Sequence, residues 1–178
     1  MKIKRIRGFA MNTLMTIGYE GANIDDFVAS LKSAGVKVLI DIRQLPISRK
    51  RGFAKTALSN AMANAGMEYI HIKALGDPKE GRIAARSGDM ELFEKIFRTH
   101  LSKPDSMEAV HQAIEIAMTS PSCLLCFERD FTCCHRAIVA ECMLEHSDLK
   151  IRHLGVRKGL AQNEACDDSQ PKPISACG

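Results

Sequence analysis

The chain has 178 residues, of which 46% are hydrophobic and 26% are charged, and this composition fits one soluble globular domain. Its formal net charge of +4 permits an anionic partner without demanding one. No apolar run approaches the roughly 20 residues that span a membrane, and no apolar signal segment follows the basic start MKIKRIRGFA. We therefore expect a cytoplasmic protein without membrane association, whose seven cysteines are thiols in a reducing compartment.

The two ends of the chain differ in composition from its middle. We expect residues 1–12 to form a basic N-terminal extension and residues 13–156 to form an α/β domain. Residues 157–178 are expected to be a polar C-terminal tail without stable structure, because NEACDDSQPKPISACG has proline and no apolar period. Cys166 and Cys177 are therefore set aside as tail thiols.

Between these ends, strand signals and helix signals alternate. Short apolar runs predict strands, and apolar residues at helical spacing between a capping residue and a glycine predict helices. The predicted strands are 13–18, 36–42, 67–72, 122–127 and 150–154. The predicted helical segments are 23–35, 54–66, 89–101, 105–118 and 134–146.

Two helix starts and one helix end carry specific signals. Asn23 is the expected N-cap of the first helix, and Gly35 is its expected terminator. Asp105 and Glu108 have the spacing of a capping box. The order of the elements predicts a single three-layer Rossmann-like domain with a mainly parallel sheet of about five strands and helices on both faces.

The unusual polar residues follow the predicted strands, at the end where open α/β sheets bind ligands. Tyr19 comes after the first strand, Asp41 ends the second and His71 ends the third. The segment 128–136 follows the fourth strand. If the strands are parallel, these residues meet on one rim, and we expect Tyr19, Asp41 and His71 to line a cleft there. A structural alternative is that Asp41 orients Arg43 through an ion pair and that the backbone forms the hydrogen bonds of His71.

The loop after the second strand is strongly basic. Four cations fall within nine residues, with a serine among them: Arg43, Ser48, Arg49, Lys50 and Arg51. Such a loop suits a phosphate, a sulfate or a nucleic-acid backbone, although charge runs are also common on solvated loops. We expect Arg43, Ser48 and Arg49, together with Arg136, to bind an anion.

The stretch ERDFTCCHR holds the candidate catalytic residues. Cys134 lies at the predicted start of a helix, where the helix dipole lowers a thiol pKa. We expect Cys134 to be the nucleophile and Glu128 or His135 to carry the proton. The spacing differs from the Cys-x₅-Arg loop of cysteine phosphatases. Alternatively, Cys134 only packs in the core and His135 is a structural hydrogen-bonding residue.

A metal site is the other chemistry that these residue types allow. Cys123 and Cys126 form a CxxC, and Cys133, Cys134 and His135 follow it. Zinc sites use such residues, but positions three apart on a strand point to opposite faces, so the CxxC pair is not expected to chelate one ion. We predict no metal and no other cofactor.

Four blocks resemble, in order, the motifs of a bacterial family named domain of unknown function 488. In this chain they read TIGYEG, LIDIRQLPISRKRGF, YIHIKALGD and LLCFERDFTCCHR, and the resemblance covers about residues 13–155. The family motifs place these residues at their fixed positions: Gly18, Tyr19, Asp41, Arg43, Pro46, Ser48, Arg49, Phe53, His71, Leu75, Gly76, Cys126, Glu128, Cys134, His135 and Arg136. Asp77 replaces a second glycine, and Cys133 is an extra thiol. The family name assigns no activity, so the resemblance supports the site and leaves the reaction open.

Three functions fit these observations. The first is a cytoplasmic enzyme that binds an anionic substrate (a phosphorylated metabolite, a nucleotide or a nucleic-acid end) at the strand ends, as a Cys-dependent transferase or hydrolase. The second is a non-catalytic nucleic-acid-binding module, whose affinity would fall steeply with salt. The third is a thiol-based redox or metal-binding protein. A purely structural alternative to all three is a buried ion-pair network that only fixes the loops. Such a network would tolerate Cys134→Ala but not Arg43→Ala.

Overall fold

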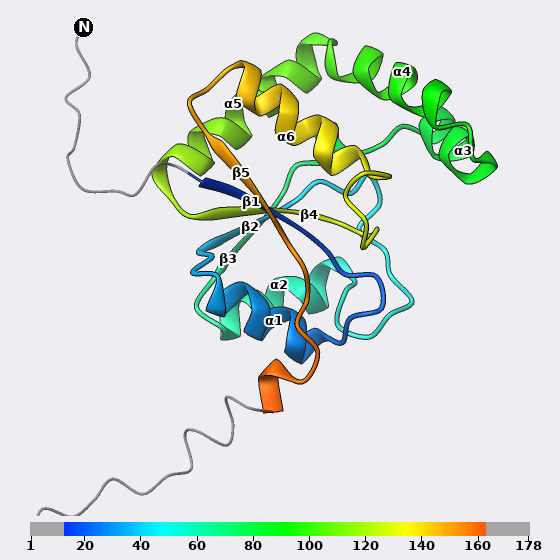
Figure 1. Cartoon of the computed structure of the whole chain (residues 1–178). Coiled ribbons are helices and arrows are strands. Elements are labelled where there is room, and N and C mark those ends of the chain that lie inside the picture. Colours follow the sequence, from blue (N-terminus) through cyan, green and yellow to red (C-terminus); the bar gives the residue numbers. More distant parts are fainter. Residues whose placement is uncertain (1–12, 163–178) are drawn as a thin grey trace, which may run out of the picture.

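The computed structural model of the chain describes residues 13–162, and its centre is one five-stranded sheet. The strands lie in the order β3-β2-β4-β1-β5, and every neighbouring pair is parallel (Figure 1). Their bounds are β1 Thr13–Gly18, β2 Val38–Asp41, β3 Glu68–His71, β4 Ser122–Cys126 and β5 Lys150–Leu154. The predicted α/β fold with a parallel sheet is confirmed.

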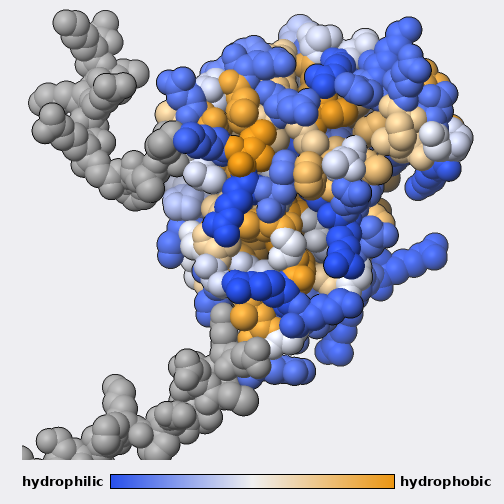
Figure 2. Space-filling model, viewed as in Figure 1, coloured by the Kyte–Doolittle hydropathy of each residue, from blue (hydrophilic) through white to orange (hydrophobic). Residues whose placement is uncertain are grey.

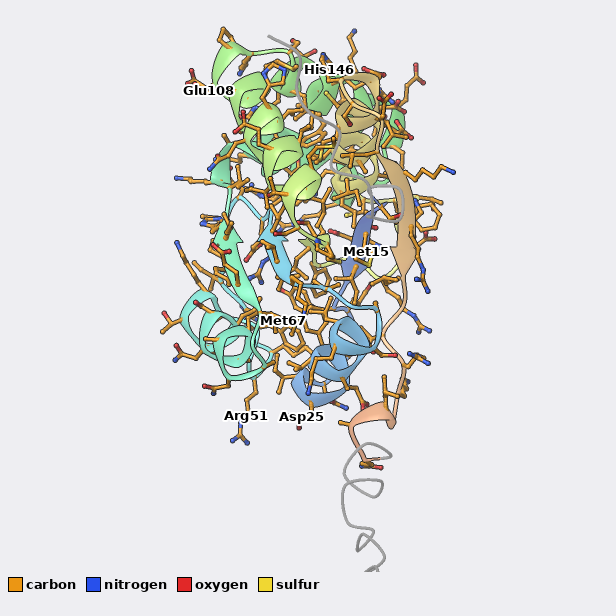
Figure 3. All side chains as sticks on the ribbon, turned by 90° about the vertical axis from the view of Figure 1, so that its left-hand side faces the viewer. Met15, Asp25, Arg51, Met67, Glu108 and His146 are labelled. Atoms are coloured by element: carbon orange, nitrogen blue, oxygen red, sulfur yellow. The ribbon has the colours of Figure 1, made fainter. Side chains whose placement is uncertain are left out.

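Helices cover both faces of this sheet, which gives the three layers seen in Figures 1 and 3. Helices α1 and α2 lie on one face, and α4, α5 and α6 lie on the other. The bounds are α1 Ile24–Ser33, α2 Lys55–Asn64, the 3₁₀ turn η1 Lys73–Leu75, α3 Lys79–Ser87, α4 Met90–Leu101, α5 Pro104–Thr119 and α6 His135–Glu145.

Two hydrophobic cores, one on each face, hold the layers together. Strand residues alternate between them, as the pleat requires. In β4, Leu124 packs in the core under α5 and α6, whereas Cys123 and Leu125 pack in the core over α1 and α2. Cys126 has the parity of Leu124, so Cys123 and Cys126 face opposite sides of the sheet, as predicted.

Local sequence signals predicted the start and end of α1 correctly, but they missed α3 and predicted the wrong start for α5. Asn23 caps α1 by accepting a hydrogen bond from the Asp26 backbone N–H at 2.7 Å, and Gly35 follows the helix with φ +77°. The capping box at Asp105 was wrong: α5 begins at Pro104, whose fixed φ suits the first helical position. Helix α3 was missed.

The chain beyond β5 packs back on α1. The Asp26 carboxylate accepts hydrogen bonds from the backbone N–H groups of Gly159 (2.8 Å) and Ala161 (3.1 Å), and Ser30 Oγ accepts one from Arg157 N–H (3.0 Å). The first residues of the predicted tail therefore belong to the folded part. The predicted N-terminal extension and the rest of the tail, with Cys166 and Cys177, lie outside the described residues.

The surface is mainly hydrophilic on the face shown in Figure 2, where apolar residues form separate patches among polar ones. Among residues 13–162, no helix combines the length and the apolar character needed to cross a bilayer.

The connections of β1 and β4 diverge at the carboxyl end of the sheet. From β1 the chain runs through α1 on one face to β2, and from β4 it runs through α6 on the other face to β5. These two strands are direct neighbours, with Gly18 opposite Cys126. Adjacent strands whose connections leave in opposite directions form the crevice in which open α/β sheets bind ligands.

Candidate functional site

The crevice begins where the chain after β4 crosses the end of β1. A Cβ added at Gly18 would lie 1.7 Å from the Glu128 carbonyl oxygen, so only glycine allows this crossing. Two hydrogen bonds fix it: the Glu20 backbone N–H donates to the Phe127 carbonyl at 2.9 Å, and the Arg129 backbone N–H donates to Glu20 Oε2 at 3.0 Å. The sequence therefore builds the crossing from the glycine of TIGYEG and the loop of the ERDFTCCHR block.

A pocket of about 690 Å³ opens beside this crossing, between the β1–α1 loop, the basic loop and the segment after β5. Four cations and three carboxylates line it: Lys50, Arg51, Arg129, Lys158, Glu20, Asp25 and Asp26. Figure 3 shows Arg51 and Asp25 extending from the end of the molecule that carries α1 and α2. The first turn of α1 also lines the pocket and adds the positive end of its dipole.

The balance of charge in this pocket favours an anion. Two of the carboxylates are already engaged with backbone N–H groups, since Glu20 accepts from Arg129 and Asp26 accepts from Gly159 and Ala161. The N–H groups of Gly159 and Ala161 lower the pKa of Asp26, which keeps it ionised. Within residues 13–162, no backbone group is hydrogen-bonded to the side chains of the four cations.

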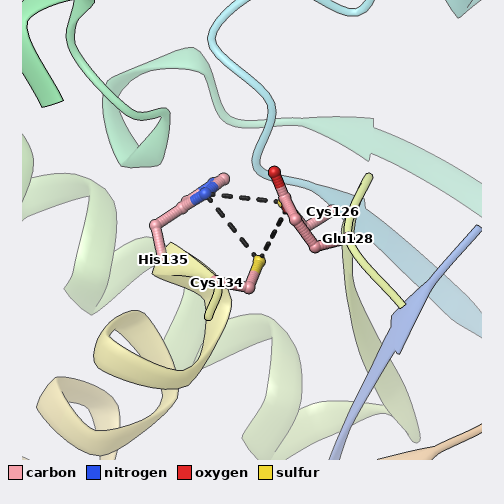
Figure 4. Close-up of side chains that lie close together, drawn as sticks. All are labelled: Cys126, Glu128, Cys134 and His135. Atoms are coloured by element: carbon pink, nitrogen blue, oxygen red, sulfur yellow. Dashed lines mark hydrogen bonds between the residues drawn. The ribbon is translucent and has the colours of Figure 1, made fainter. Parts of the chain in front are cut away.

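On the other side of the crossing, four side chains meet in a cluster (Figure 4). Cys126 ends β4, Glu128 follows it, Cys134 is the N-cap of α6, and His135 begins that helix. Glu128 Oε2 lies 2.7 Å from Cys126 Sγ and 3.1 Å from Cys134 Sγ. His135 Nδ1 lies 3.5 Å from Cys126 Sγ and 4.0 Å from Cys134 Sγ. We call these four residues the thiol cluster.

The imidazole of His135 is held in one orientation. Its Nε2 lies 3.1 Å from the Ile42 carbonyl oxygen, which only accepts, so Nε2 carries a proton and donates it there. The ring also packs against Phe97 in a T-shaped arrangement. Nδ1 therefore faces the two sulfur atoms, and the three ligand-type atoms point toward one another.

Burial and neighbouring charge set the protonation of the thiol cluster. Burial raises the pKa of the Cys126 and Cys134 thiols. Burial alone would raise the pKa of Glu128, but hydrogen bonds from the two thiols outweigh it and lower that pKa. Burial alone would lower the pKa of His135, but Cys134 and the Glu128 carboxylate raise it to about 9. In the metal-free chain the thiols thus donate to an ionised Glu128.

Asp77 adds a second carboxylate to this neighbourhood. It is 7% exposed, and within the described residues its Oδ1 has no hydrogen-bond partner. Burial raises its pKa to about 6, while the charges of His135 and Arg82 act in the opposite direction. Asp77, which stands where the resembled motif has a second glycine, is therefore a buried acid near the thiol cluster.

Arg43, predicted to bind an anion, lies in a buried network at the end of β2. Its Nε and Nη2 donate to the two carboxylate oxygens of Asp41 at 2.9 and 2.6 Å. Its Nη1 donates to Tyr19 Oη at 3.0 Å and to the Phe53 carbonyl at 2.9 Å. Tyr69 Oη donates to Asp41 Oδ2 at 2.6 Å. The arrangement is the ion-pair network that the sequence also allowed.

Arg136 is 1% exposed and fastens the crossing segment rather than lining the pocket. Its Nη1 donates to the Glu128 carbonyl and its Nη2 to the Arg129 carbonyl, the second at 3.0 Å. This explains why an arginine follows Cys134 and His135: it holds the loop that carries Glu128 against the end of β1.

The other predicted site residues lie apart from the thiol cluster. Ser48 Oγ accepts from the Lys50 backbone N–H at 3.2 Å, and Arg49 is exposed outside the pocket. His71 Nε2 lies 2.8 Å from the Arg43 carbonyl oxygen at the end of β3. Their anion-binding and cleft-lining roles remain predictions.

Sequence reasoning missed two groups of residues. Arg129 and Lys158 line the pocket, but Lys158 lies in the segment expected to be tail. Cys126 was considered in a CxxC with Cys123 and as a motif position, but it was given no role in the site, whereas it contacts Glu128, its neighbour at i+2. The available signal was the C-x-E spacing itself, because alternate positions of an extended segment face the same side.

The family model described as Domain of unknown function DUF488 matches residues 23–143. The matched segment contains the basic loop, Arg129 and the whole thiol cluster. No curated protein and no solved structure matches the chain.

Proposed function

The chain belongs to the DUF488 family, and from that premise we propose that it is an enzyme whose substrate is anionic and carries a phosphate group. The substrate binds in the pocket beside the crossing of β1, and the thiol cluster contributes the chemistry. The observation that carries the proposal is the position of the pocket: it opens at the carboxyl ends of the neighbouring strands β1 and β5, beside the loop that follows β4, with four cations and the start of α1 around it.

The chemistry of the pocket suits phosphate. Lys50 and Arg51 come from one loop, Arg129 from a second and Lys158 from a third, so the cations reach the pocket from three separate segments. Arginine forks and lysine ammonium groups both bind phosphate oxygens, and the N–H groups of a helix start add to them. A volume of about 690 Å³ is in the range of small-molecule sites and accommodates a nucleotide-sized ligand.

The loop after β4, which crosses the end of β1, connects the pocket to the thiol cluster. The Arg129 side chain lines the pocket, while the side chain of the residue before it, Glu128, joins the thiol cluster on the other side. The residue proposed to bind the substrate phosphate, Arg129, thus directly follows a residue of the proposed reaction centre in the chain. We assign substrate binding to the four cations and the chemistry to the thiol cluster, of which Glu128 is the partly exposed member.

Charge reversal tests the binding step. We expect Arg51→Glu and Arg129→Glu to weaken binding of ATP and of inorganic pyrophosphate roughly 10- to 100-fold, as loss of a charge-assisted hydrogen bond implies. Isothermal titration calorimetry at low salt measures this. Arg49→Glu is the matched control, because Arg49 is exposed in the same loop but does not line the pocket. Equal losses in all three variants, or no binding by the wild-type chain, would refute the proposal.

A nucleic-acid ligand is the second candidate, favoured by exposed apolar side chains on the same rim. Phe127 is 45% exposed and Phe131 is 37% exposed, on either side of Arg129. Exposed rings beside cations form stacking platforms for single strands. This candidate predicts that an oligonucleotide binds far more tightly than ATP, with an affinity that falls steeply with salt and depends on Phe127.

A further inference from the structure

We propose that the thiol cluster is a zinc site in which Cys126 Sγ, Cys134 Sγ and His135 Nδ1 bind Zn²⁺, with Glu128 as the fourth ligand. When the metal binds, the two thiol protons and any proton on His135 Nδ1 leave to solvent. This inference does not rest on the proposed function: the site would stand even if the pocket bound no anion.

The spacing of the four ligand atoms fits one tetrahedral ion. With Zn–S, Zn–N and Zn–O bonds of ordinary length, ligand atoms lie roughly 3.3–3.8 Å apart. His135 Nδ1 lies 3.5 and 4.0 Å from the two sulfur atoms, and all four atoms lie within 4.8 Å of one another. The shorter contacts of Glu128, at 2.7 and 3.1 Å, are thiol hydrogen bonds that a metal would replace. The side chains therefore need only small shifts.

The hydrogen bonds and strand pairing that hold the ligand side chains in place are also typical of a metal site. A metal-bound histidine usually donates its other ring N–H to a carbonyl or carboxylate, and His135 donates Nε2–H to the Ile42 carbonyl. Cys134 Sγ accepts from the Arg136 backbone N–H at 3.5 Å, a contact that favours the thiolate form. Cys126 is fixed at the end of the central strand β4, which pairs on both sides. The site is thus held before metal arrives.

Charge and burial indicate the ion and its open side. Two thiols with one imidazole select zinc over magnesium or calcium, which prefer oxygen ligands. Buried Asp77 adds negative charge near the cluster, which favours a dication. Three ligands are buried, whereas Glu128 is partly exposed. Glu128 therefore occupies the position that water or a substrate can take, as in zinc sites that keep an exchangeable ligand.

A second group of metal-binding residue types differs on each of these points. Cys142, Glu145 and His146 lie within one turn at the end of α6, where Glu145 and His146 are exposed. His146 Nδ1 already lies 2.9 Å from the Cys142 carbonyl oxygen, so this ring nitrogen is engaged by its own helix. Three metal-binding residue types close together are not enough to indicate a metal site. The thiol cluster differs because its ligands are mostly buried and are held by hydrogen bonds from surrounding groups.

The test uses the full chain with Cys166→Ser and Cys177→Ser, so that tail thiols do not contribute. We expect about one zinc per chain by elemental analysis after expression in zinc-supplemented medium. We expect Co²⁺ to replace it with an intense sulfur-to-cobalt charge-transfer band. Cys134→Ser and Cys126→Ser should lower zinc affinity by at least the roughly 10- to 100-fold that loss of a second-shell partner costs. Cys133→Ser, the exposed neighbour of Cys134, is the control and should keep the metal and the band.

Two outcomes would overturn the inference. One is a folded, fully reduced wild-type chain that holds no zinc and gives no charge-transfer band with Co²⁺. The other is a Cys133→Ser variant that loses as much metal as Cys134→Ser. If the serine variants of the cluster fail to fold, X-ray absorption of the zinc-loaded wild-type chain decides, because the proposal requires two sulfur ligands and light-atom ligands on one ion.

Discussion

Two polar groups of side chains lie at the carboxyl ends of neighbouring strands, β2 and β4, and they are satisfied in opposite ways. In the network of Asp41, Arg43, Tyr19 and Tyr69, every charged group contacts its opposite charge, and Arg43 makes four side-chain hydrogen bonds. In the thiol cluster, two sulfur atoms, one ring nitrogen and one carboxylate oxygen face one another. The first group is a network in which charges and donors are paired, and we call it the closed network; the second brings together the atoms that the proposed zinc site requires.

The difference shows that a position on the ligand-binding rim does not by itself make a residue functional. Arg43 is as well placed as Cys134, but the donors of its guanidinium are already used by Asp41, Tyr19 and Phe53. Its guanidinium fixes the loop 43–53 that carries Lys50 and Arg51 to the pocket. A residue of the closed network thus acts on the site indirectly, by positioning the groups that bind.

The largest expected effect comes from breaking the closed network. Arg43→Ala leaves Asp41 buried without its cation, which typically costs about 3–5 kcal/mol in the free energy of unfolding. In metal-free protein, Cys134→Ala should cost only about 1 kcal/mol, the usual effect of a point substitution. Urea denaturation of both variants in the presence of a chelator measures the contrast.

Arg49→Ala is the control for this comparison, because its exposed side chain should change stability by less than about 0.5 kcal/mol. An Arg43→Ala chain as stable as wild type would mean that the ion pair is not needed for folding. Arg43 would then return as a candidate anion ligand.

The sequence predicted the fold well because its strong signals are local. Apolar runs, Asn23 and Gly35 determine elements without reference to the rest of the chain. Helix α3 was missed because KEGRIAARS has no apolar stripe: only Gly81 and Ala84 of this helix are buried, and Ile83 is exposed. A Cβ at position 81 would lie 2.2 Å from Asp77 Oδ1, a contact that no local pattern reveals, so a larger residue there would require this carboxylate to move.

The site was harder to predict because its geometry depends on contacts between distant segments. The sequence placed Glu128, Cys134 and His135 together, but the orientation of the imidazole is set by the Ile42 carbonyl, which is 93 residues away. Arg43 was ambiguous from the start: the same spacing to Asp41 allowed an ion pair or a free anion ligand. Only the distances to Asp41, Tyr19 and Phe53 show how its donors are used.

A smaller change tests how much one hydrogen bond of the Asp41–Arg43 network contributes to stability. Tyr69→Phe removes one hydrogen bond to Asp41 and should cost about 1–3 kcal/mol, as for a bond to a charged group. Burial and the Asp41 carboxylate raise the pKa of Tyr69, so the phenol stays protonated and donates throughout the neutral range. Urea denaturation measures the loss. A cost near zero would mean that water replaces the phenol and that the network is less closed than its distances suggest.

The smallest expected effect is local and concerns the far end of the pocket. Asp26 is another satisfied carboxylate: backbone N–H groups hold its pKa below the ordinary value of 3.8, so it is ionised at neutral pH. Its anchoring of Gly159 and Ala161 is present above that value and is lost as the pH falls through the lower, folded-state pKa. Asp26→Ala should therefore speed amide hydrogen exchange of the segment 157–162 at pH 7 and leave exchange in β4 unchanged.

The same variant connects this anchor to binding, because Lys158 lies between the arginine and the glycine that are tied to α1. When the segment is released, Lys158 no longer has a fixed position at the pocket, so pyrophosphate affinity should fall by a few-fold, less than for Arg129→Glu. Asp26→Asn separates charge from geometry: the amide keeps one acceptor oxygen, and exchange intermediate between wild type and Asp26→Ala is expected. Exchange in 157–162 that does not respond to either variant would show that packing on α1, and not the carboxylate, holds Lys158 at the pocket.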